Sequence, residues 1–103
     1  MYAREITLDL KADSKTSFTV TMENDILPIL RKQNGFKDGI TFFSQDGTEG
    51  VGISLWDSKA NADAYEKASY PQVATALKRL SASEPKVKSF EVSNSTWHKI
   101  AAK

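Results

Sequence analysis

The sequence predicts an α+β fold with the element order βαββαβ along 103 residues. Three observations predict it. Apolar and polar residues alternate in the first segment, as they do in a half-buried strand. Apolar residues recur at helical spacing in two later segments, and breaks rich in glycine, proline or asparagine separate the segments. At this length the chain is expected to be one domain, covering residues 1–103.

The first predicted strand covers residues 4–11. Ile6, Leu8 and Leu10 share one face of it, because successive side chains of a strand point to opposite sides. That face should pack against the core, and the other face carries polar side chains. The chain enters this strand without the basic, apolar and small-residue sections of a signal sequence, which favours a cytoplasmic protein.

A helix is predicted over residues 15–34, where apolar residues recur at helical spacing until Asn34 and Gly35 supply a stop signal. The β-branched residues early in this segment would also suit a strand. Pro28 would cost about 3 kcal/mol inside a regular helix. The sequence therefore predicts a kink near residues 24–28.

A β-hairpin is predicted next. Residues 39–45 and 51–56 have the composition of two antiparallel strands, and an Asp-Gly pair supplies a turn between them. Phe42 and Phe43 are neighbours in the first of these strands, so their side chains must point to opposite faces of the sheet. Each face should therefore carry a large aromatic residue.

A second helical segment is predicted after the hairpin, with Asp57 and Ser58 as capping residues. Pro71 interrupts it and suits the first turn of a second helical piece, where the missing N–H costs little. Pro85 ends this piece, and residues 87–96 are predicted to form the last strand. The segment therefore contains two helical pieces and returns to the sheet.

This order of elements builds a ferredoxin-like, four-stranded antiparallel sheet with the helices on one face. The other face is left uncovered and carries at least one large aromatic side chain. An uncovered apolar face of this kind is a natural dimer surface. The pattern of elements therefore favours a homodimer.

The composition disfavours several classes of function. The net charge is +1, from 14 basic and 13 acidic residues, and the lysines are spread along the chain, which disfavours a nucleic-acid partner. No apolar run approaches about 18 residues, so no membrane partner is expected. The chain has no cysteine, which excludes disulfides and thiolate chemistry. With a single histidine and no nucleotide-binding motif, hydrolase and nucleotide-dependent activities are disfavoured.

Two segments, ILPILRKQNGF at residues 26–36 and SLWDSKANADAYEKASYPQV at residues 54–73, resemble the antibiotic biosynthesis monooxygenase-like (ABM) family of dimeric α+β barrel proteins. The resemblance implies a homodimer whose two sheets pack into a barrel, with the last strand reaching toward the partner. Some members of that family oxidise polycyclic phenols or quinols with O₂ and use no metal or flavin. The resemblance therefore implies no cofactor. Other members degrade haem or have no assigned activity.

In the haem-degrading branch, a tryptophan, a first-strand asparagine and a second-helix histidine act together. Trp56 matches the tryptophan, but the first strand has no asparagine and Thr75 stands at the histidine position. Haem degradation is therefore disfavoured, because haem iron needs an axial ligand. His98 lies outside the matched position and is expected to be an ordinary surface or interface residue.

The candidate site residues gather at the junction between the third strand and the helix after it. Trp56, Tyr65 and Tyr70 could line a pocket there, with the tyrosine hydroxyls donating to a phenolate oxygen. The alternative is that all three only fill the core. Asp9 could act as a base if it faces the cavity, although exposure or pairing with a lysine is the commoner outcome. Ser54 shares the strand face of Trp56 and could bind a ligand or simply pack.

The predicted function is cofactor-independent oxygenation of a small aromatic or quinol-like compound by a homodimer. The alternative is a non-catalytic dimeric protein of the same fold that binds a small ligand or acts in stress. The acidic residues Asp57, Asp63 and Glu66 are close in sequence, but capping and an exposed helix face explain them better than a metal site does.

Overall fold

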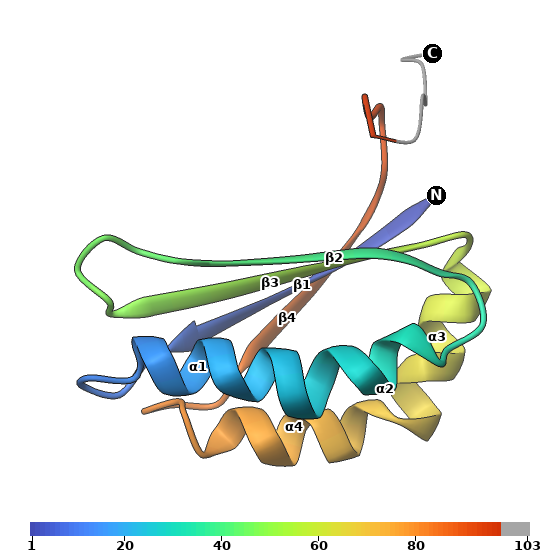
Figure 1. The fold of residues 1–103 in the computed structure, drawn as a ribbon. Helices are drawn as coiled ribbons and strands as arrows, with labels where there is room; N and C mark the ends of the chain where they lie inside the picture. Colours follow the sequence, from blue (N-terminus) through green and yellow to red (C-terminus); the bar gives the residue numbers. More distant parts are fainter. Residues whose placement is uncertain (98–103) are drawn as a thin grey trace.

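The computed structural model describes residues 1–97. These residues form a four-stranded antiparallel sheet with helices on one face (Figure 1). The strands are β1 (Tyr2–Asp9), β2 (Phe36–Phe43), β3 (Glu49–Trp56) and β4 (Lys86–Glu91). Their order across the sheet is β2-β3-β1-β4. The predicted α+β, ferredoxin-like arrangement is confirmed.

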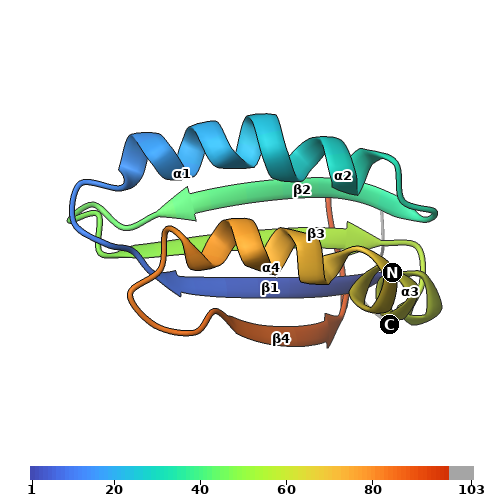
Figure 2. The same cartoon turned by 90° about the horizontal axis from the view of Figure 1, so that it is seen from below.

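The helical layer covers one face of this sheet. Its elements are α1 (Lys15–Thr21), η1 (Met22–Ile26), α2 (Leu27–Arg31), α3 (Lys59–Ala68) and α4 (Tyr70–Lys78). Figure 2 looks through the helices onto the sheet and shows α1 and α2 along β2, α4 over β1, and α3 at the end where β3 finishes. None of the helices in residues 1–97 is long and apolar enough to cross a bilayer.

The predicted kink takes the form of one wide helical turn. Residues Met22–Ile26 form a π-helix, and Pro28 follows in the first turn of α2. In a regular helix the proline ring would collide with the carbonyl group four residues earlier, and a widened turn gives that ring room. The helix also ends at Arg31, three residues before the predicted end at Asn34. Helix ends are easily displaced by a few residues, because the last turn is held by few contacts.

Serine, not aspartate, caps α3. The Ser58 hydroxyl accepts a hydrogen bond from the Asn61 backbone N–H at 3.2 Å. Asp57 instead pairs with Lys37 at 3.2 Å, so its predicted role as a cap is wrong. Pro71 lies in the first turn of α4, as predicted, because the first helical N–H groups have no partner within the helix.

The last strand is shorter than predicted. It ends at Glu91, whereas the prediction extended it to residue 96. The run of serine and asparagine after it has low strand propensity and favours turns. The Val92 N–H still donates to the Met1 carbonyl at 3.0 Å. Residues 92–97 leave the sheet on the side opposite the helices (Figure 1) and run behind the sheet from β4 toward β2 in the view of Figure 2. Trp97 borders a shallow depression there with Gly39 of β2.

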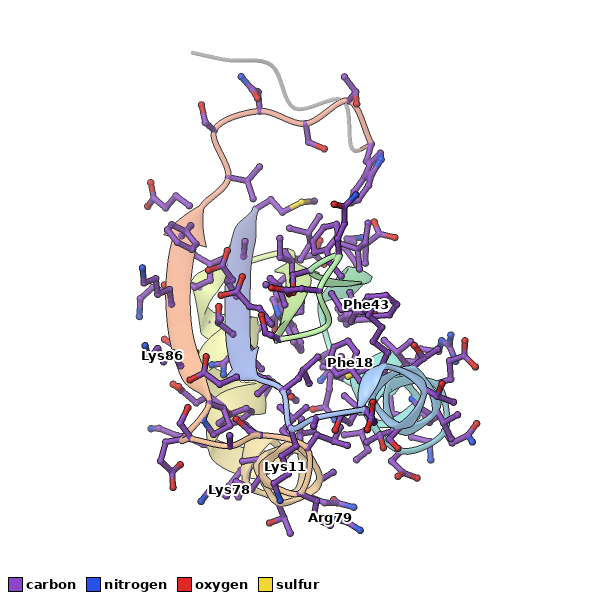
Figure 3. The ribbon with its side chains drawn as sticks, turned by 90° about the vertical axis from the view of Figure 1, so that its left-hand side faces the viewer. Lys11, Phe18, Phe43, Lys78, Arg79 and Lys86 are labelled. Atoms are coloured by element: carbon purple, nitrogen blue, oxygen red, sulfur yellow. The ribbon has the colours of Figure 1, made fainter. Side chains whose placement is uncertain are left out.

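The core lies between the sheet and the helices. Phe18 of α1 is 2 % exposed and points toward the sheet (Figure 3). Phe43 lies on the same side, with the Lys15 Nζ 5.2 Å from its ring centre. Its neighbour Phe42 lies on the uncovered face and is 46 % exposed. The prediction that these two phenylalanines point to opposite faces is confirmed.

Gly35 connects the first helical segment to β2. Its backbone φ is 79°, a value that residues other than glycine rarely adopt. A Cβ atom at this position would lie 2.7 Å from the Cβ of Asn61. We expect Gly35→Ala to lower the free energy of unfolding by about 1–2 kcal/mol, from backbone strain plus this overlap. Urea unfolding followed by circular dichroism measures it.

Gly47→Ala is the matched control for Gly35→Ala. Its φ of 74° carries the same backbone strain, but an added Cβ would meet mainly the Lys15 side chain, which can move away. The difference between the two variants isolates the overlap with Asn61. Equal losses in both variants would contradict the proposed overlap.

Candidate functional site

Aromatic side chains from four elements meet where β3 ends. The Trp56 ring stacks on Tyr65 of α3 with ring centres 5.0 Å apart and planes at 28°. Tyr70 of α4 meets the Tyr65 ring edge-on at 6.2 Å, and Phe36 of β2 meets Trp56 edge-on at 5.5 Å. The structure therefore brings together three of the four predicted site residues, Trp56, Tyr65 and Tyr70. We refer to these three and Phe36 as the aromatic cluster.

Trp56 is completely buried, with 0 % of its surface exposed. Its Nε1–H donates a hydrogen bond to the Ser54 Oγ at 2.9 Å, because both side chains point to the helical side of β3. The only polar group of this tryptophan is therefore already bonded within the protein. Trp56 therefore suits a rigid support behind Tyr65 better than a donor to a ligand.

Both tyrosines of the cluster are neutral phenols at neutral pH. Burial raises the pKa of Tyr65 well above its usual range, and the nearby Arg4 guanidinium opposes this only in part. Burial also raises the pKa of Tyr70, again against the effect of Arg4. Each hydroxyl can therefore donate a proton to a hydrogen bond with an oxygen anion, but neither serves as a base.

Arg4 is a buried cation beside these tyrosines. It is 2 % exposed, and its guanidinium carbon lies 4.9 Å from the Tyr70 ring centre and 5.4 Å from that of Tyr65. Both distances allow cation–π attraction. Its Nη1 pairs with a Glu66 Oε1 at 3.1 Å, whereas Nε and Nη2 are buried without a hydrogen-bond partner among residues 1–97. Each unmade buried hydrogen bond costs about 1–3 kcal/mol.

Arg4 is not among the site residues predicted from the sequence, although the sequence contains a signal for it. Arg4 has the same phase in the first strand as Ile6 and Leu8, so the alternating pattern places a charged residue on the core face. Long charged side chains are almost never fully buried unless they are paired. A charged residue at a strand position whose side chain faces the core is therefore a candidate for a functional site.

A small cavity lies beside the aromatic cluster, between the sheet and the η1–α2 part of the helical layer. Its volume is about 40 Å³. Met22, Leu27 and Leu30 line it from the helices, and Ser54 and Tyr65 are among its polar lining residues. Of the three aromatic residues predicted to line a pocket, Tyr65 borders this cavity, whereas Trp56 and Tyr70 do not. An apolar cavity of roughly 150 Å³ holds one benzene ring. An aromatic ligand must therefore displace side chains, and the flexible Met22 is suited to such movement.

The structure does not bring Asp9 into the aromatic cluster. Tyr2 pairs with Trp56 at one end of β1, while Asp9 pairs with Glu49 at the other, roughly 23 Å away along the strand. The Asp9 carboxylate is exposed and accepts a hydrogen bond from the Ser83 hydroxyl at 2.5 Å. This end of the molecule carries the basic residues Lys11, Lys78, Arg79 and Lys86 (Figure 3). The Asp9 carboxylate is therefore too far away to act as a base on a ligand held beside Tyr65.

The residues considered for haem do not form a site for it. Thr75 lies on the exposed side of α4, and its hydroxyl donates to the Pro71 carbonyl at 3.0 Å. Neither its chemistry nor its position suits an axial ligand of haem iron. His98 lies outside the described residues.

The three acidic residues near α3 each have a different cation as partner. Asp57 pairs with Lys37, Asp63 with Lys59 at 2.7 Å, and Glu66 with Arg4. Within residues 1–97 no three histidine, aspartate or glutamate side chains converge as a group that could hold a metal ion. These carboxylates therefore act as separate ion-pair partners.

Solved structures provide the comparison that bears on the family, because neither a protein-family model nor a curated protein sequence matches the chain. The monooxygenase ActVA-Orf6 of Streptomyces coelicolor, in complex with the ligand Nanaomycin D, superposes with a TM-score of 0.76 and 18 % identity. The match covers 91 % of this chain and 88 % of that one. The chain has the fold of the antibiotic biosynthesis monooxygenases.

Two further structures share this ABM fold. An antibiotic biosynthesis monooxygenase matches with a TM-score of 0.70 and 13 % identity, over 89 % of this chain and 98 % of that one. Rv0793 from Mycobacterium tuberculosis matches with a TM-score of 0.73 and 17 % identity, over 92 % and 97 %. The TM-scores establish the ABM fold, and at these low sequence identities they establish the fold alone.

Proposed function

We propose that this protein is a cofactor-independent monooxygenase that acts on a small aromatic or quinol-like compound. The observation that carries the proposal is the cavity between sheet and helices, which has apolar walls and the neutral phenol of Tyr65 at its edge. A substrate there would be shielded from water, and Tyr65 would hydrogen-bond to its oxygen. The ABM fold, shared with a monooxygenase in complex with Nanaomycin D, supports the same class of reaction.

The proposed reaction needs no electron donor other than the substrate. A CH₂ group next to a ketone, or the hydroxyl of a phenol, loses a proton to solvent before the cavity encloses the substrate, and the resulting anion transfers one electron to O₂. The substrate radical and superoxide combine at carbon to a peroxide, which takes up a proton and then loses water to leave a carbonyl. For a CH₂ group the sum is CH₂ + O₂ → C=O + H₂O. Tyr65 would stabilise the anion by donating a hydrogen bond, and Trp56, which stacks on Tyr65 but does not itself line the cavity, would hold the Tyr65 ring in place.

Oxygen uptake by the purified, metal-free protein tests this proposal. Anthrones, naphthols and quinols are offered in turn, and their uncatalysed autoxidation is subtracted. We expect protein-dependent uptake with at least one class, and we expect Tyr65→Phe to lower kcat by about 100-fold, because it removes the hydroxyl and little else. Tyr2→Phe is the matched control, since Tyr2 packs against the core but does not line the cavity. Equal activity in both variants would contradict the role of Tyr65.

We further propose that the protein works in the cytoplasm as a homodimer formed through the uncovered face of the sheet. Phe42 and Phe90 on this face are 46 % and 48 % exposed, and Trp97 is 60 % exposed. Exposed aromatic side chains of this size on one side of a small protein suit an interface between copies. Residues 92–97 leave the sheet on this side and would reach toward the partner.

A non-catalytic, dimeric ligand-binding protein of the same fold is the second candidate. Two observations favour it: the cavity is small, and the Trp56 N–H is already bonded to Ser54. Such a protein would bind an aromatic compound beside the cluster and leave it unchanged. Binding without oxygen uptake across the whole panel would support this candidate over the monooxygenase.

A further inference from the structure

Arg4 presents more hydrogen-bonding capacity than the protein uses. The side chain is 3 % exposed and, within residues 1–97, makes one ion pair, through Nη1. Nε and Nη2 carry N–H groups in the plane of the guanidinium, and neither has a partner among the described residues. A planar guanidinium with free donors matches an oxygen anion such as a carboxylate or a phenolate.

The surroundings of Arg4 suit an aromatic ligand that carries such an anion. The rings of Tyr65 and Tyr70 lie within about 6 Å of the guanidinium, as in cation–π contacts, and Tyr65 also lines the cavity. Ser54, which lines the cavity as well, is the β3 neighbour of Arg4 in the sheet register. Arg4 therefore lies one side chain away from the cavity, on the side of the two tyrosines.

Glu66 is a partner that can be displaced. Its side chain is 53 % exposed, whereas that of Arg4 is 3 % exposed, so the carboxylate can turn into water while the guanidinium stays buried. Water solvates a carboxylate that turns outward, and this lowers the cost of moving Glu66 away from Arg4. Glu66 can therefore move away, and its repulsion of an anion bound at Nε and Nη2 is relieved.

We propose that Arg4 is a specificity-determining residue, which selects aromatic ligands bearing an anionic oxygen by binding that oxygen with its free N–H groups. The proposal rests on the proposed function only in taking the site beside the aromatic cluster as the ligand site. The new element is that the ligand is negatively charged, a property that neither the ABM fold nor the cavity specifies. The anionic oxygen belongs either to a ring carboxylate or to a phenolate.

Calorimetric titration with matched pairs of ligands tests the selection. 2-Naphthoate is compared with neutral 2-naphthamide, and 2,4-dinitrophenolate with 1,3-dinitrobenzene, so that the two pairs separate carboxylate from phenolate recognition. We expect the protein to bind at least one anion about 10-fold or more tightly than its neutral counterpart. Arg4→Met, which keeps the length of the side chain, should remove this preference.

Two more variants complete the test. Glu66→Gln removes the competing carboxylate, so the affinity for the preferred anion should rise about 3-fold or more, which a merely structural ion pair would not produce. Arg79→Met removes an exposed cation at the far end of α4 and should leave both affinities unchanged. If Arg4→Met does not fold, the Glu66→Gln result decides.

Equal affinity for anion and neutral ligand in the unmodified protein would overturn the proposal, and so would an anion preference that survives Arg4→Met. An unchanged or weaker affinity in Glu66→Gln would overturn it too. Binding is measured without turnover, so the proposed oxygenation can fail independently. Anion selection without oxygen uptake would refute the oxygenase and keep the role of Arg4.

Discussion

Trp56→Ala should lower the free energy of unfolding by about 3–5 kcal/mol. The side chain is fully buried, stacks on Tyr65 and meets Phe36, so its removal leaves a cavity that the neighbouring rings cannot fill. It also removes the hydrogen bond to Ser54. Small domains have a total stability of about 5–15 kcal/mol, so the loss is a large fraction of the whole. Urea denaturation followed by far-ultraviolet circular dichroism measures it.

Trp97→Ala is the internal control for this prediction. Trp97 is 60 % exposed and lies beyond the last strand, so its truncation should change the free energy of unfolding by no more than about 0.5 kcal/mol when both variants are measured in protein diluted until it is monomeric. The two variants make the same chemical change in opposite environments. Similar losses in both would mean that Trp56 is not packed as the structure shows.

Ile53→Asp should convert the proposed homodimer into a monomer. Ile53 lies on the uncovered face of the central strand β3, where its neighbours are Glu5 of β1 and Ile40 of β2. In a dimer the new carboxylate would be buried beside the like charge of Glu5. We expect a cost of about 3 kcal/mol or more, which raises the dissociation constant more than about 100-fold. Light scattering coupled to size-exclusion chromatography gives the mass directly.

Val20→Asp supplies the comparison for Ile53→Asp. Val20 is an exposed apolar residue, 48 % accessible, but it lies on α1, which belongs to the helical layer on the opposite side of the sheet. This variant should keep the mass of the unmodified protein. A monomeric unmodified protein at micromolar concentration would refute the homodimer, and a dimer that survives Ile53→Asp would place the interface on another surface.

The fold could be predicted because local patterns determine it. Alternation in β1 fixes which face is buried, and the segment around Pro71 shows where one helix stops and another starts. The hairpin follows from two strand-like runs separated by turn residues. Element ends were less predictable. Residues 92–96 were predicted as strand, yet Ser93 and Asn94 favour turns over a sheet ladder.

The candidate site could be predicted only in part. Trp56, Tyr65 and Tyr70 were expected to lie together because a strand end and its following helix place them near one another, and the structure has them in contact. Asp9 was a candidate because of its charge, but its distance from Trp56 depends on the antiparallel register between β1 and β3. Cavity volume depends on the packing of whole side chains, which no local pattern specifies.

The π-helix of residues Met22–Ile26 explains an unusual spacing in the first helical segment. The buried residues Phe18, Met22, Ile26 and Leu30 follow one another at intervals of four. With 3.6 residues per turn, three such steps in a regular α-helix would rotate the stripe by roughly 120° away from its starting direction. The π-helical turn has more residues per turn, which reduces this rotation. The four buried side chains therefore continue to face the sheet. This one turn is therefore the place where the helix can differ in length by a residue without turning its apolar side toward water.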